Sequence, residues 1–168
     1  LWLIRKGQFA KAEPYLRRAV KTLTEKNPNP YDGEPLYNLG LSLKYQGKTD
    51  EAYDYFYKAC WNAAWQDAGY YSLAQLSASK GNWEDALYEI DKSLLRNWHN
   101  LRGRHLKAVV LRHLGRVDEA LDLIRESLAI DCFNFGCSFE EYLLTGEKAV
   151  LDDLLVRMRS EGHNYEEL

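Results

Sequence analysis

The chain has 168 residues, of which 46% are hydrophobic and 28% are charged, as in an ordinary globular protein. Its net charge of −3 argues against a nucleic-acid partner, because such a partner needs a clustered basic face. No stretch approaches the run of about 20 apolar residues that a membrane-spanning helix needs. Three cysteines without a CxxC pair argue against a zinc site or a disulfide framework and favour a reducing compartment. We therefore expect a cytoplasmic location, with no membrane partner, metal or cofactor.

Residues 1–26 are expected to form a helical hairpin that lacks the start of its first helix. Gly7 and Ala12 lie five residues apart in this stretch, a spacing that recurs three times further along the chain. Residues 27–33 are rich in proline and turn-forming residues, which predicts a stiff polar loop. The first residues lack the pattern of a secretion signal. Because the chain also starts without methionine, we expect it to be a piece of a longer protein.

Three consecutive stretches, 33–66, 67–100 and 101–134, repeat one pattern. Each has a glycine followed five residues later by an alanine, and both recur every 34 residues: Gly47 and Ala52, Gly81 and Ala86, Gly115 and Ala120. Apolar residues on both sides of the glycine fall at helical spacing, so each stretch predicts two helices with the glycine in the turn between them. A period of 34 is typical of helical hairpins that bury one another's apolar faces by stacking.

The pattern within residues 33–66 resembles the tetratricopeptide repeat (TPR) family. The matching residues there are Leu36, Leu39, Gly40, Leu43, Gly47, Ala52, Phe56 and Ala59. Residues 67–100 and 101–134 match more loosely. Arg104 and Lys107 stand where apolar residues are usual, and Trp98 and Cys132 stand where a proline normally closes the repeat. The resemblance implies an all-α, right-handed solenoid of about four to five stacked hairpins, the first of them truncated. It also implies a non-catalytic scaffold for protein–protein interaction.

The C-terminal part predicts a shorter, less regular hairpin over residues 135–161, with its turn near Thr145 and Gly146. After Gly162, residues Asn164–Leu168 read as the first turn of a further helix. We therefore expect a single array over residues 1–168. It consists of a partial repeat plus loop (1–31), the three repeats, and a divergent end (135–168).

A narrower resemblance covers most of the chain and depends on two short runs, residues 27–34 and 56–62. These runs are similar to the C-terminal TPR region of large bacterial multidomain proteins of unassigned function. The similarity implies a scaffold appended to another domain, and it brings no catalytic residue with it.

The TPR resemblance also implies a place for ligands, because the first helix of each repeat lines a concave groove in that family. The groove positions fall on Tyr37, Leu41, Lys44, Tyr71, Gln75, Arg102, His105 and Arg112, and Phe139 continues the row of rings. Rings flanked by a few cations suit a peptide with apolar and acidic residues. Alternatively, the rings pack on adjacent helices. The array is then a structural module that docks onto other domains of its own chain or onto a copy of itself.

Other sites are not supported by the sequence. The family's carboxylate clamp for chaperone C-termini is matched only at Asn38 and Arg102, so we expect no chaperone-tail binding. His105 and His113 are about 12 Å apart along a helix, too far for one metal ion. Neighbouring acidic residues on a helix point about 100° apart and do not converge on a substrate. We therefore predict no catalytic residue.

Overall fold

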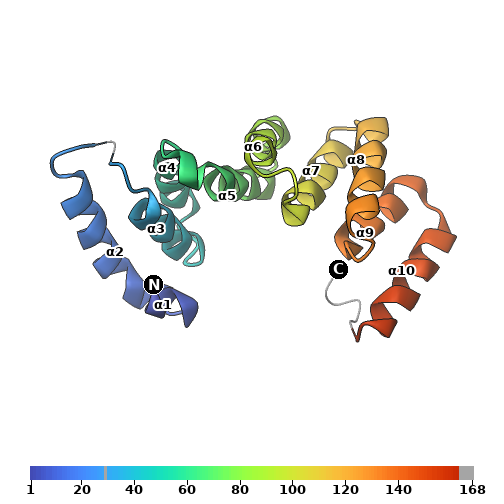
Figure 1. Ribbon diagram of the computed structural model, residues 1–168, viewed down its shortest axis with the longest axis horizontal. Coiled ribbons are helices and arrows are strands. Elements are labelled where there is room, and N and C mark those ends of the chain that lie inside the picture. The colour runs from blue at the N-terminus through green and yellow to red at the C-terminus, as the bar shows by residue number, and fades with distance from the viewer. Residues whose placement is uncertain (29, 163–168) are drawn as a thin grey trace. The chain divides into compact units, whose positions relative to one another are not determined.

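The computed structural model describes residues 1–28 and 30–162, and over these ranges it contains helices and no strand (Figure 1). The helices are α1 (Trp2–Arg5), α2 (Phe9–Thr24), α3 (Glu34–Lys44), α4 (Thr49–Ala59), η1 (Ala63–Trp65), α5 (Gln66–Ser79), α6 (Trp83–Arg96), α7 (Leu101–His113), α8 (Val117–Ile130), α9 (Phe135–Thr145) and α10 (Lys148–Ser160). The predicted all-α class is confirmed. The expected start of a further helix at Asn164–Leu168 lies outside the described residues.

The 34-residue period appears directly in the helix boundaries. The second helices of the three repeats, α4, α6 and α8, begin at residues 49, 83 and 117. The glycine two residues before each start has a positive φ, of 76°, 76° and 72° at Gly47, Gly81 and Gly115. Nothing lies within 4 Å of where a Cβ would be at these three positions, so glycine is required there by backbone conformation and not by space.

Small residues allow the two helices of a hairpin to approach closely. A Cβ added to Gly40 of α3 would lie only 2.7 Å from the ring of Phe56 on α4. Phe56 itself is completely buried, as are Ala52, Ala86 and Ala120 at the repeated alanine position. The small residues at these positions therefore allow the two helices of a hairpin to pack closely.

The chain divides into two compact units, one of residues Leu1–Arg96 and one that begins at Asn97. In the first unit α2 packs on α3, α3 on α4, α4 on α5 and α5 on α6. In the second unit α7 packs on α8 and α9, α8 on α9, and α9 on α10. Each unit buries its own apolar core. That both units belong to one array over residues 1–168 stays a prediction.

The cysteines differ sharply in exposure. Cys60 of the first unit and Cys137 of the second are buried, whereas Cys132, between α8 and α9, is exposed. Burial raises the pKa of Cys60 to about 12 and that of Cys137 to about 11. All three thiols are free.

A carboxylate on α2 holds the first hairpin against the repeat that follows. Glu13 accepts hydrogen bonds from Lys48 Nζ at 2.8 Å, from Arg17 Nε at 2.8 Å and from Gln46 Nε2 at 2.9 Å. Lys48 and Gln46 lie in the turn between α3 and α4, so these bonds cross from one hairpin to the next. Together, and led by the bond from Lys48, they lower the pKa of Glu13 to about 2.

Acid is expected to weaken the first unit through this carboxylate. Because the pKa of Glu13 is lower in the folded state, its contribution is present above pH 4.5, the ordinary value, and is lost as the pH falls towards 2. Glu13→Gln should therefore lower the free energy of unfolding by about 1–2 kcal/mol at pH 6 and by almost nothing near pH 2. The value at pH 6 is modest because the side chains of Lys48 and Arg17 are partly exposed, so solvent screens their charges. Urea unfolding at both pH values measures the difference. Glu25→Gln, an exposed carboxylate at the end of α2, is the control, and an equal cost of Glu13→Gln at both pH values would contradict the expectation.

Candidate functional site

Five of the predicted groove residues lie on α3 and α5 of the first unit, and hydrogen bonds join three of them. Lys44 Nζ donates to Gln75 Oε1 at 2.6 Å, and Gln75 Nε2 donates to the hydroxyl oxygen of Tyr71 at 3.1 Å. All three side chains are half-buried, and burial lowers the pKa of Lys44. The repeat spacing thus brings residues of two successive first helices into one polar row.

The ammonium group of Lys44 has a neutral hydrogen-bond partner and no carboxylate partner among the described residues. Gln75 accepts its hydrogen bond, and the ring of Tyr45 lies 6.0 Å away. Leu41, one helical turn before Tyr45, packs against the core of the first unit and is only partly buried. This part of the surface therefore offers a cation beside an apolar side chain.

Tyr37, by contrast, is held within the packing of its neighbours. Its ring centroid lies 5.4 Å from that of Phe56 and 4.9 Å from that of Trp65. Ser72 Oγ lies 3.5 Å from its hydroxyl oxygen, and burial raises the pKa of Tyr37. The ring connects α3 to η1 and to α4.

The second unit carries the other three groove candidates on α7. Arg102 is exposed, whereas His105 packs against α9, where a Cβ on Gly136 would lie 2.4 Å from its Nδ1. Burial lowers the pKa of His105. Arg112 Nε donates to Glu140 Oε2 at 2.6 Å, so its charge is already paired with a buried carboxylate. Of these three residues, only Arg102 is exposed.

Phe139, expected to continue the row of rings, lies on α9. It is half-buried, and its ring centroid is 6.2 Å from that of Tyr142 on the same helix.

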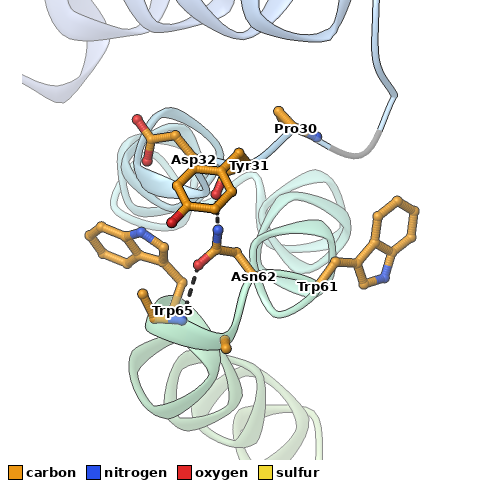
Figure 2. A pocket seen from close by; sticks show the side chains of 8 residues that line it. Pro30, Tyr31, Asp32, Trp61, Asn62 and Trp65 are labelled. Carbon is orange, nitrogen blue, oxygen red and sulfur yellow. Dashed lines mark hydrogen bonds between the residues drawn. The ribbon is translucent and has the colours of Figure 1, made fainter.

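A cleft of about 580 Å³ lies beside the segment that follows α4 and includes η1 (Figure 2). It is lined by Pro30, Tyr31, Asp32, Trp61, Asn62, Ala63, Ala64 and Trp65. Asn62 joins its two sides, since its side-chain nitrogen donates to the Tyr31 carbonyl and its side-chain oxygen accepts from the Ala64 amide at 3.0 Å. In Figure 2 the Trp61 ring points away from Tyr31 and Trp65.

Trp65 connects this cleft to the predicted groove, because the ring that lines the cleft also packs at a tilt against the Tyr37 ring. Sequence reasoning predicted the loop that supplies Pro30, Tyr31 and Asp32 but not the cleft itself. No period marks these residues, which come from a loop and from η1 and meet only in the folded chain.

Metal sites and membrane-spanning helices are both absent from the described part of the chain. Among residues 1–28 and 30–162, no group of three or more His, Cys, Asp or Glu side chains is arranged to hold a metal ion. None of the described helices combines the length and the apolar character needed to cross a membrane.

Comparison with known proteins identifies the repeats. Two family models, both described as tetratricopeptide repeat, match residues 33–60 and 103–130.

Solved structures are similar in fold. The crystal structure of MamA is 18% identical, covers 94% of this chain and 88% of its own, and has a TM-score of 0.72. A putative kinesin light chain from Podosopora anserina, with nearly identical TPR-like repeats, is also 18% identical. It covers 94% of this chain and 88% of its own, and has a TM-score of 0.73. YrrB, a TPR protein with an unusual peptide-binding site, is 18% identical and covers 84% of this chain and 72% of its own, with a TM-score of 0.65.

Proposed function

We propose, from the premise that this chain belongs to the tetratricopeptide-repeat family, that it is a non-catalytic scaffold which binds a peptide or protein segment along its first helices. The TPR fold supports a role in protein–protein interaction. YrrB, which shares the fold, has a peptide-binding site. A cytoplasmic location is part of the proposal and is supported by the three free thiols.

The observation that carries the proposal is the half-buried ammonium group of Lys44, which lacks a carboxylate partner within the described part of the chain. An unpaired cation in a partly desolvated place gains from an anionic ligand group. Leu41 and Tyr71 lie on the same two helices and supply apolar surface and a hydroxyl group. A peptide with acidic and apolar residues therefore fits this surface best.

A structural role is the second candidate, and the packing of two rings favours it. Tyr37 lies against Phe56 and Trp65, and His105 lies against Gly136, so both rings take part in packing between helices. In this case the array docks onto other domains of a longer chain or onto a second copy. The resemblance to the repeat region of bacterial multidomain proteins is consistent with that role.

Selection of peptides from a displayed random library, followed by fluorescence anisotropy, tests the first proposal. We expect selected peptides to be rich in acidic and apolar residues and to bind Lys44→Gln and Tyr71→Ala at least tenfold more weakly, equivalent to about 1.4 kcal/mol. Tyr15→Ala, an exposed ring on α2, is the control and should bind normally. If no peptide is selected, or if affinity is unchanged in both variants, the structural role is favoured. Sedimentation equilibrium then tests for self-association.

A further inference from the structure

A second cleft of the first unit combines tyrosine rings with carboxylates. It measures about 240 Å³ and lies among α4, α5 and α6. Its lining residues are Tyr53, Tyr57, Tyr70, Leu73, Asp85, Tyr88 and Glu89, and none of these is basic. We call it the tyrosine cleft. It shares α5 with the row formed by Lys44, Gln75 and Tyr71, but none of these three residues lines it.

Glu89 is the unusual member of this lining. The residue is only 4% exposed, and its Oε1 accepts a hydrogen bond from the Tyr53 hydroxyl group. Its Oε2 is buried and has no hydrogen-bond partner among the described residues. A buried carboxylate oxygen without a partner is costly, and a cation placed beside it offsets that cost through its opposite charge. Burial raises the pKa of Glu89, as expected for a carboxylate that lacks a cation.

A cation site needs aromatic faces that a cation can reach, in addition to negative charge, and the tyrosine rings provide them. Tyr57 and Tyr88 are 51% and 60% exposed, so their faces are accessible from solvent, while Tyr53 and Tyr70 are half-buried. The ammonium group of Lys92, one turn after Tyr88 on α6, already lies 5.2 Å from the centroid of the Tyr88 ring. A ring of this cleft therefore attracts a cation within the chain itself.

We propose that the tyrosine cleft binds an alkylammonium group, with the rings of Tyr57 and Tyr88 facing the cation and the carboxylates of Glu89 and Asp85 supplying opposite charge. The volume suits one head group and not a drug-sized ligand. The group can come from a small quaternary amine or from a lysine side chain of a partner protein. The chemistry recognised is the same in both cases.

Titration followed by ¹H–¹⁵N NMR tests this proposal, with choline chloride as the probe. The uncharged carbon isostere 3,3-dimethylbutan-1-ol is the matched control, and sodium chloride keeps the ionic strength constant. We expect saturable shifts over α4, α5 and α6 with choline, with a Kd of roughly millimolar order, and much smaller shifts with the alcohol. Equal shifts with the two probes, or no saturation with choline, would overturn the proposal.

Variants separate the roles of rings and charge. Tyr57→Ala and Tyr88→Ala should each weaken choline binding about fivefold without unfolding the protein, because both rings are exposed. Glu89→Gln should also weaken it, whereas Lys92→Gln should tighten it by removing the competing ammonium group. Tyr15→Ala, an exposed ring on α2, should change nothing. Choline binding that is unaffected by both tyrosine variants would contradict the assignment to this cleft.

A second titration identifies the source of the ammonium group. Acetyl-lysine methylamide with a free or a trimethylated side-chain amine replaces choline. Tighter binding of either lysine compound assigns the cleft to a partner's side chain, and tighter binding of choline assigns it to a small amine. The variants Lys44→Gln and Tyr71→Ala should leave all of these affinities unchanged, so this test is independent of peptide binding by the first helices.

Discussion

Replacement of Phe56 by alanine is expected to lower the free energy of unfolding of the first unit by about 3–5 kcal/mol. The Phe56 side chain is fully buried between α3 and α4, directly beneath Gly40 and 5.4 Å from the ring of Tyr37. Alanine leaves a cavity between α3 and α4. The two helices can fill it only by changing the way they pack against each other. Urea denaturation followed by circular dichroism measures the loss.

Two variants check the origin of this effect. Tyr57→Ala changes the next residue along α4, which is 51% exposed, and should stay within roughly 0.5 kcal/mol of the unaltered protein. Gly40→Ala should cost about 1–3 kcal/mol, because its methyl group meets the Phe56 ring, and much less once Phe56 has been replaced by alanine. If Phe56→Ala were as mild as Tyr57→Ala, the described packing would be wrong.

Arg104→Ala is expected to cost the second unit about 2–4 kcal/mol, the second largest loss. Arg104 is fully buried in α7, where its Nε donates to Ser127 Oγ at 2.7 Å and its Nη2 donates to Glu126 Oε2 at 3.2 Å. Its guanidinium group also lies 4.3 Å from the centroid of the Trp98 ring. Alanine removes all of this contact and leaves a cavity.

Arg104→Met separates packing from charge. The Nη1 atom of Arg104 is buried without a hydrogen-bond partner among the described residues, so the charge is imperfectly compensated. Methionine fills much of the same volume and removes that charge, so we expect a stability within about 1 kcal/mol of the unaltered protein. Chemical denaturation of both variants provides the comparison. A loss with methionine as large as with alanine would show that the hydrogen bonds, and not the filled volume, stabilise this site.

The hairpins could be predicted from the sequence because one residue type determines each key conformation. Gly47, Gly81 and Gly115 mark turns that need a positive φ, and Ala52, Ala86 and Ala120 mark buried positions where helices cross closely. The 34-residue period of these residues is therefore enough to predict the fold class. Arg104 could not be interpreted in this way. The pattern showed only a charge at an apolar position, since its partners Glu126 and Ser127 lie on the next helix.

The candidate sites could be predicted only in part, because they too depend on contacts between helices that the repeat pattern does not specify. The family pattern gave the groove positions, but which of these side chains have partners depends on the neighbouring helix. Arg112 pairs with Glu140, whereas Lys44 meets the neutral Gln75. The tyrosine cleft has no sequence signal at all. Its rings come from three helices and occupy different positions in their repeats, so no period relates them.

Because the three thiols differ in burial, the rate at which each buried cysteine is modified reports how often its own unit opens. A thiol reacts as a thiolate that meets solvent, so exposed Cys132 is available at once. Cys60 reacts only when the first unit opens, and Cys137 only when the second unit does. The rates of modification at Cys60 and Cys137, referred to that of Cys132, therefore give the opening free energies of the two units separately, in the unaltered sequence and with or without a ligand.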